Sequence, residues 1–172
     1  MTKPIRGALA ALLSLGIACA HAAAGDAPPD YLGTLRDGTP VHAQQFQGKV
    51  VVVTFWATWC GYCMKELPVL ANIQRLAGAA RLQVVAISHD EERSTYVQVA
   101  RQLKDLGLVL AYDGDKKAAA AFGVNGIPHM VMIGRDGRIA HVHVGYDQDM
   151  LPTIADELNA LLAAPAASSA TP

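Results

Sequence analysis

The stretch Thr54–Cys63, which reads TFWATWCGYC, places two cysteines with two residues between them directly after a hydrophobic run. That run, Val50–Phe55, is mostly apolar and β-branched, which is typical of a strand buried on both faces. The residues Met64–Leu76 after it are compatible with a helix. Cys60 would therefore open that helix, where the partial positive charge of the N-terminus stabilises a thiolate. A thiolate attacks disulfides, and Cys63, one turn along, can resolve the mixed disulfide, so the stretch predicts thiol–disulfide exchange.

Strands and helices alternate along much of the chain, and an antiparallel hairpin and a helix close it. The predicted strands are residues 31–35, 39–41, 50–56, 82–88, 108–112, 130–133 and 138–144, and the predicted helices are residues 60–77, 91–106, 116–122 and 150–163. This order predicts an α/β fold with a mixed central sheet and helices on both faces. Cys60 then lies at the carboxyl end of a central strand, where open α/β sheets place their sites.

The N-terminus has the pattern of an export signal. Lys3 and Arg6 precede an apolar segment, and Ala22–Ala24 offers a cleavage site. The apolar segment is shorter than the ~20 residues of a spanning helix, and an uncleaved membrane anchor is the alternative. Export predicts a location in the periplasm. The predicted divisions are a signal peptide at residues 1–24, a linker at 25–29, one domain at 30–163 and a disordered tail at 164–172.

The net charge and the number of cysteines limit the classes of partner and the roles that the cysteine pair can have. Without residues 1–24 the chain keeps 148 residues, with 12 Lys and Arg against 15 Asp and Glu, and a net charge of −3. That charge gives no indication of nucleic acid or an anionic membrane as a partner. Only Cys60 and Cys63 remain, and a structural disulfide across so short a loop would add little stability.

The third cysteine, Cys19, falls inside the predicted signal peptide. We expect it to be a small apolar residue that is removed with the signal. The alternative is a lipid on Cys19, which would anchor the protein to a membrane face.

The residues around the cysteine pair form a wider pattern: Trp59 before the first cysteine, Glu66 three residues after the second, and Gly126-Ile127-Pro128 far downstream. With these residues the chain resembles the thioredoxin superfamily and, within it, the exported TlpA/ResA/DsbE-like thiol–disulfide oxidoreductases. The resemblance covers about residues 30–163. It implies a thioredoxin fold with an inserted strand–helix segment at residues 82–106, while the strands at 31–41 predict an N-terminal hairpin.

The resemblance also implies a direction and partners. It implies a reductase of protein disulfides that receives electrons through a membrane thiol carrier and acts in cytochrome c maturation or metal-site assembly. Its clients would be apocytochrome c or a copper-site assembly protein, no dissociable cofactor would be needed, and we expect a monomer.

The residues between the cysteines depart from the family, which usually has proline just before the second cysteine. Gly61-Tyr62 instead looks like the dipeptide of periplasmic disulfide isomerases. Because such residues tune thiolate stability, Gly61 and Tyr62 are expected to tune the reduction potential. A disulfide isomerase or oxidase therefore stays an alternative function, as does a non-enzymatic chaperone for copper or haem.

Glu66 is a candidate catalytic residue. It lies on the same helix face as Cys63 and can accept the proton of that thiol as it becomes a nucleophile. The alternative is a glutamate that only stabilises the start of the helix through the dipole. Thr54 occupies a strand position where thioredoxins keep a buried aspartate, so a carboxylate for proton transfer must come from elsewhere.

Three residues are candidates for binding the client. Pro128 matches the family's cis-proline, which implies that it lies beside the cysteines and leaves the backbone of Ile127 free to pair with an extended segment. An ordinary trans proline is the alternative. Trp59 is a candidate platform for the client, whereas Trp56 is expected in the core.

Histidines raise the question of a copper site with the cysteines. The candidates are His89, His129, His141 and His143. No ligand spacing favours such a site, and zinc would need a further Cys or His pair, so we expect no metal.

Overall fold

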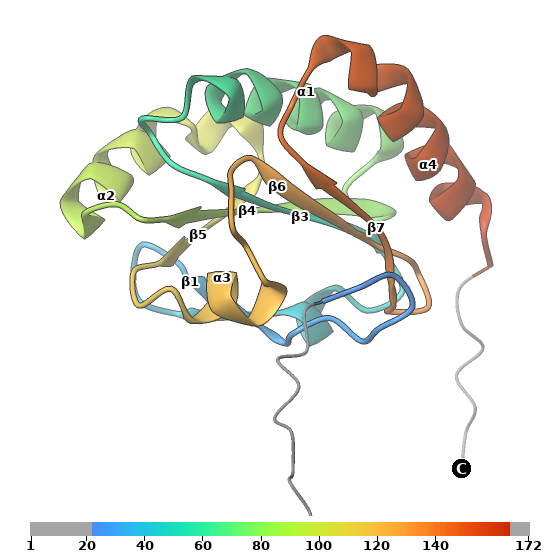
Figure 1. The fold of residues 1–172 in the computed structure, drawn as a ribbon, viewed down its shortest axis with the longest axis horizontal. Coiled ribbons are helices and arrows are strands. Elements are labelled where there is room, and N and C mark those ends of the chain that lie inside the picture. Colours follow the sequence, from blue (N-terminus) through green and yellow to red (C-terminus); the bar gives the residue numbers. More distant parts are fainter. Residues whose placement is uncertain (1–21, 166–172) are drawn as a thin grey trace, which may run out of the picture.

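The seven residues of β3, Val50–Trp56, are all buried and run through a seven-stranded mixed sheet (Figure 1). The computed structural model describes residues 22–165. The other strands are β1 (Tyr31–Thr34), β2 (Pro40–His42), β4 (Leu82–His89), β5 (Val109–Asp113), β6 (His129–Ile133) and β7 (Ile139–Val144). The α-helices are α1 (Gly61–Ala77), α2 (Arg93–Gln102), α3 (Lys117–Phe122) and α4 (Leu151–Ala163), and short 3-10 turns cover Ala43–Phe46, Lys104–Leu106 and Gln148–Met150.

The strand order is β2-β1-β5-β4-β3-β6-β7, which leaves β3 and β4 in the interior of the sheet. β3, β4 and β5 pair in parallel, whereas β6, β7 and the β1–β2 hairpin pair antiparallel with their neighbours. Because β3 has a strand on each edge and side chains packed on each face, a run of β-branched apolar residues suits it. The strand ends at Trp56, and the cysteines follow directly.

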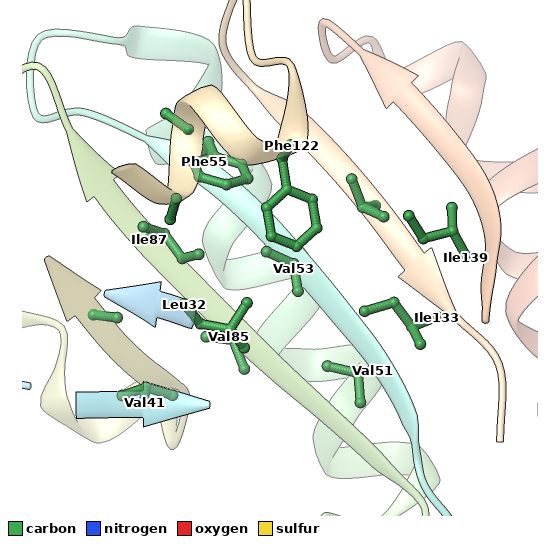
Figure 2. Packing of buried hydrophobic residues seen from close by; sticks show 14 residues of the cluster. Leu32, Val41, Val51, Val53, Phe55, Val85, Ile87, Phe122, Ile133 and Ile139 are labelled. Atoms are coloured by element: carbon green, nitrogen blue, oxygen red, sulfur yellow. The ribbon is translucent and has the colours of Figure 1, made fainter. Parts of the chain in front are cut away.

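Helices cover both faces of this sheet, as predicted (Figure 1). On one face, Leu70 of α1 and Ile154 of α4 pack with Val52 of β3. On the other face, Phe122 of α3 packs with Phe55 of β3 in the cluster shown in Figure 2. The two layers bury the central strands and so fix the strand end that carries the cysteines.

α1 begins and ends where its terminal residues satisfy the backbone. Cys60 is its N-cap, with extended backbone angles (φ −87°, ψ 97°), and the Cys60 sulfur accepts a hydrogen bond from the N–H of Cys63. At the other end, Gly78 has a φ of +85°, which L side chains rarely adopt. The Gly78 N–H donates to the carbonyl of Gln74 at 2.9 Å.

The predicted helix at residues 91–106 is wrong in its extent. α2 begins at Arg93 because its N-cap, Glu92, takes extended backbone angles (φ −67°, ψ 137°). α2 ends where Leu103 takes a φ of −86° and a ψ of 0°, and a separate 3-10 turn follows. The other predicted strands and helices agree with the structure to within one residue at either end, and the N-terminal hairpin is confirmed.

The predicted linker, residues 25–29, has no regular secondary structure. Its start runs beside β7, because the Gly25 N–H donates to the Ile139 carbonyl at 2.7 Å and the Ile139 N–H donates to the Asp26 carbonyl at 2.9 Å. Cys19 and most of the predicted signal peptide, and residues 166–172 of the predicted tail, lie outside the described residues. Within residues 22–165, no helix is long and apolar enough to cross a membrane.

Candidate active site

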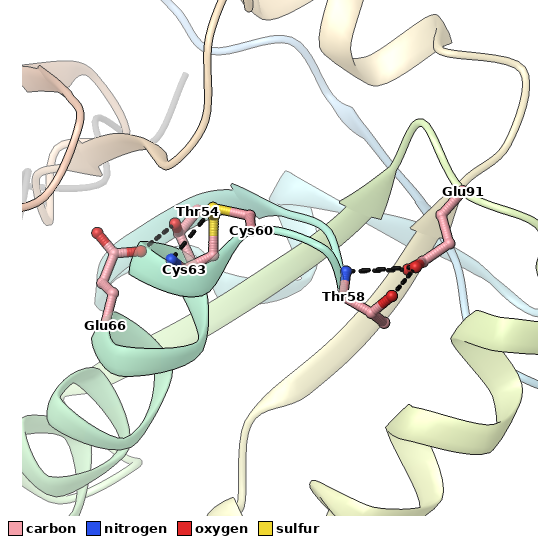
Figure 3. Close-up of a disulfide and its surroundings, with 6 residues drawn as sticks. All are labelled: Thr54, Thr58, Cys60, Cys63, Glu66 and Glu91. Carbon is pink, nitrogen blue, oxygen red and sulfur yellow. Dashed lines mark hydrogen bonds between the residues drawn. A yellow bond between two sulfur atoms is a disulfide. The ribbon is translucent and has the colours of Figure 1, made fainter.

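Cys60 and Cys63 are joined by a disulfide at the N-terminus of α1, with their Cα atoms 5.3 Å apart (Figure 3). The two cysteines differ in exposure, since Cys60 is 7% exposed and Cys63 is fully buried. Both belong to an apolar cluster that includes Trp56 and Leu67. An incoming sulfur therefore reaches Cys60 more easily, which suits the attacking role expected for it and leaves Cys63 as the inner partner.

Glu66, one turn beyond Cys63, is buried with its carboxylate turned into the protein. The Thr54 hydroxyl donates a hydrogen bond of 2.7 Å to Oε2 of Glu66, and Oε1 has no partner within residues 22–165. The buried carboxylate that thioredoxins keep on the strand is thus replaced by a strand threonine that holds a helix glutamate. The sequence shows the departure at Thr54 but gives no sign of this contact.

Burial raises the pKa of Glu66 from 4.5 to about 7, although the hydrogen bond from Thr54 opposes the shift. A carboxyl group with such a pKa can hold or release a proton at neutral pH, as a general acid or base must. Glu66 is also in the second turn of α1, and the helix has no acidic residue in its first turn. Stabilisation by the helix dipole, which fades beyond the first turn, therefore does not explain this residue.

Two exposed aromatic side chains lie close to Cys60 in the sequence. Trp59 is 62% exposed, and Tyr62, between the cysteines, is 63% exposed. The Ile127–Pro128 peptide bond is cis, and no hydrogen bond of the Ile127 backbone is formed within residues 22–165. A cavity of about 400 Å³ lies between Trp59 and the loop that ends at Ile127. Trp56 is fully buried, as expected.

A second carboxylate, which the sequence did not predict, contacts the turn just before Cys60. Glu91, in the loop after β4, accepts hydrogen bonds from both the backbone N–H and the hydroxyl of Thr58. Figure 3 shows this pair on one side of the disulfide and the Thr54–Glu66 pair on the other. No signal in the sequence connects Thr58 with Glu91, because 33 residues separate them.

The four histidines divide into two pairs with different surroundings. His89 and His129 pack edge-on against Phe55, and burial lowers the pKa of both. His141 and His143 of β7 instead contact the carboxylate of Glu157 in α4, at 3.3 and 2.6 Å. Within the described part of the chain, no group of three or more Cys, His, Asp or Glu side chains is arranged to hold a metal ion.

Comparison with known proteins decides the family. Residues 23–160 match the Redoxin family. The chain belongs to this family. It is similar to the thiol-disulfide oxidoreductase ResA of Bacillus thuringiensis (strain Al Hakam), with 27% identity over 123 residues, which are 70% of this chain and 69% of the relative. The thiol:disulfide interchange protein CycY of Rhizobium leguminosarum bv. viciae is 34% identical over 99 residues, which are 58% of this chain and 52% of the relative.

Solved structures agree with this result. A Chlorobium tepidum protein assigned as thiol:disulfide interchange protein DsbE superposes with a TM-score of 0.70 at 27% identity, over 82% of this chain and 99% of that one. The resemblance to TlpA/ResA/DsbE-like members of the thioredoxin superfamily is therefore confirmed, together with the thioredoxin fold. With the Cys60–Cys63 disulfide, these relatives identify the protein as a thiol–disulfide oxidoreductase.

Proposed function

We propose that the protein is an exported reductase of protein disulfides that works in the periplasm. The observation that carries the proposal is the buried pair of Cys63 and Glu66, one helical turn apart. An apolar surrounding and a nearby carboxylate both disfavour a thiolate at Cys63. A stabilised thiolate stabilises the reduced form of the cysteine pair and makes the pair a stronger oxidant. A dithiol whose thiolate is less stabilised therefore gives up its electrons more readily and is the better reductant.

The reaction would run in two exchanges. The Cys60 thiolate attacks one sulfur of a client disulfide, the client's other sulfur leaves as a thiolate, and a mixed disulfide forms. Glu66 then accepts the proton of the Cys63 thiol, and the resulting thiolate attacks the Cys60 sulfur. The client leaves with two thiols, and the protein is left with the Cys60–Cys63 disulfide. A membrane thiol carrier would return the two electrons.

Trp59, Ile127 and Pro128 would bind the client beside the exposed edge of Cys60. The free backbone of Ile127 can pair with an extended client segment, and the exposed Trp59 indole can cover an apolar side chain of that segment. The resemblance to TlpA/ResA/DsbE-like proteins supports apocytochrome c or a copper-site assembly protein as the client.

The reduction potential of the pair tests the direction of electron flow. We expect a value between about −270 and −180 mV, the range bounded by thioredoxin and protein disulfide isomerase. Equilibration with glutathione or dithiothreitol buffers, followed by thiol trapping, measures it. A value near about −120 mV would refute the reductase and favour the oxidase, for which Gly61-Tyr62 is the residue signal.

The client class needs a separate experiment. An oxidised peptide with the Cys-x-x-Cys-His pattern of c-type haem attachment should be reduced faster than the same peptide with the histidine replaced by alanine. Equal rates would argue against apocytochrome c. Copper or haem bound in stoichiometric amount to the purified protein would favour the chaperone instead.

Export is tested by the mass of the protein recovered from the periplasm of an expressing host. Cleavage after Ala24 should leave the 148 residues that begin at Gly25. A lipid-modified chain that begins at Cys19 would instead show a membrane anchor, and a full-length cytoplasmic chain would refute export.

A further inference from the structure

The turn between β3 and α1, residues 57–60, is tied to the sheet by one carboxylate. The Thr58 N–H lies 3.3 Å from each carboxylate oxygen of Glu91, and the Thr58 hydroxyl donates to Oε1 (Figure 3). The Ser88 hydroxyl donates to Oε2 at 3.2 Å. Glu91 therefore accepts three donors, and two of them belong to a residue that stands two positions before Cys60.

Glu91 is itself fixed to rigid parts of the fold. Its backbone carbonyl accepts a hydrogen bond of 2.8 Å from the Tyr112 hydroxyl, which belongs to β5. Ser88 is fully buried and pairs with Trp56 across β3 and β4. The contact from Glu91 to Thr58 thus connects the turn to two neighbouring strands of the sheet.

The residue before Glu91 supports the same turn. The carbonyl of Asp90 accepts a hydrogen bond of 3.3 Å from the Trp59 indole. Asp90 has a φ of +57°, which is uncommon for a residue with a side chain, and its carboxylate forms an ion pair with Lys116 of the adjoining loop. Backbone strain of this kind persists only where the surrounding contacts hold it in place, and it is often found at functional sites.

We propose that Glu91 is a positioning residue for thiol–disulfide exchange, which acts through Thr58 to keep Cys60 at the N-terminus of α1. The covalent tie between the cysteines is lost when the disulfide is reduced. The contact between Glu91 and Thr58 then holds the turn against the sheet, so the Cys60 thiolate keeps its place over the free N–H groups of the helix. This role rests on the exchange activity alone and holds for either direction of electron flow.

The pH dependence of Cys60 alkylation distinguishes positioning from simple charge. The quantity measured is the midpoint pH at which the alkylation rate of Cys60 reaches half its maximum. Loss of the negative charge at Glu91 would favour a nearby thiolate and move this midpoint to lower pH. Loss of the anchor would move the thiolate away from the helix N-terminus and move the midpoint to higher pH. For Glu91→Ala we expect a rise of about half a pH unit and a fall of about threefold in the alkylation rate at pH 7.

Two variants provide the controls. In Glu91→Gln, the amide oxygen can still accept from the Thr58 N–H and the amide nitrogen can donate to the Thr58 hydroxyl, so the midpoint should not rise. Glu92→Gln removes the same charge one residue further on, from an exposed side chain that makes no hydrogen bond within residues 22–165, and should also leave the midpoint unchanged. Glu66, Asp90 and Lys116 are unchanged in all of these proteins.

Thr58→Val tests the same contact from its other end, because it removes the hydroxyl donor and keeps the backbone N–H. Thr58→Val should raise the midpoint by less than Glu91→Ala does. The double variant Thr58→Val/Glu91→Ala should have the same midpoint as Glu91→Ala alone, since both changes act on one interaction. If Glu91→Ala does not fold, the rise in Thr58→Val decides the matter by itself.

The measurement uses the fully reduced protein and a small alkylating reagent, so it involves no client and no membrane carrier. A midpoint that rises in Glu91→Ala and returns in Glu91→Gln supports the proposal. A midpoint that stays or falls in Glu91→Ala, or rises equally in Glu92→Gln, overturns it. The reductase assignment is decided separately by the reduction potential, so either conclusion can fail without the other.

Discussion

Replacing Glu66 by glutamine tests whether its buried carboxyl group changes protonation near neutral pH. The folded group has a pKa of about 7, against 4.5 for an exposed glutamate, because burial penalises the charged form. The unfolded chain therefore releases this proton at lower pH than the folded one. Protonated Glu66 contributes stability that is fully present below pH 4.5 and is lost as the pH rises through about 7.

The size of the effect follows from the same pKa difference. At about 1.4 kcal/mol for each tenfold change in proton affinity, the difference corresponds to about 3 kcal/mol in the free energy of unfolding. Glu66→Gln cannot ionise and should lack this pH-dependent loss. With the amide oxygen kept on Thr54, the amide nitrogen would take the place of Oε1, which has no partner within residues 22–165. Its N–H groups would be buried without an acceptor, so the variant should lose about 1–3 kcal/mol at every pH.

The assay is urea unfolding of the oxidised protein at several values between about pH 4.5 and pH 8. The informative quantity is the difference between wild type and Glu66→Gln at each pH. His89 and His129 have lowered pKa values and so change stability in the opposite direction over part of this range. They are present in both proteins, and their contribution cancels in the difference.

We expect wild type to lose about 3 kcal/mol relative to Glu66→Gln from the acid to the alkaline end of this range. Glu92→Gln is the matched control, because its exposed carboxylate should leave the pH profile of wild type unchanged. Parallel profiles for wild type and Glu66→Gln would refute a neutral-range pKa, and with it the proposed proton transfer from Cys63.

Three other variants give distinct outcomes. Cys63→Ser should accumulate a mixed disulfide with client that non-reducing gels detect, whereas Cys60→Ser should form none; normal turnover by Cys63→Ser would contradict the assigned roles. Thr54→Val removes the hydroxyl that lowers the pKa of Glu66, so the pH-dependent loss of stability should move to higher pH, and an unmoved profile would count against the contact. Trp59→Ala removes an exposed indole and should raise KM for protein clients about fivefold, with a smaller effect on kcat; an unchanged KM would exclude Trp59 from client binding.

Residues that are close in sequence already predicted the centre of this site. The apolar run into Trp56, the cysteine that caps the next helix and the second cysteine one turn on are all related by strand or helix geometry. Such geometry depends on neighbours within about four residues, so it can be read along the chain. The order of strands and helices also predicts the mixed sheet, and the wider pattern around Cys60 and Pro128 indicates the family without the tertiary structure.

Tertiary structure alone decided how the carboxylates are used. The Thr54–Glu66 hydrogen bond joins residues 12 positions apart, and the Thr58–Glu91 hydrogen bond joins residues 33 positions apart. Both contacts depend on how β3 lies against α1 and β4. The sequence shows that Glu66 shares a helix face with Cys63, but not that the same face is turned away from water. Burial raises the pKa of Glu66 to about 7, and burial is a property of the packed layers rather than of any neighbouring residue.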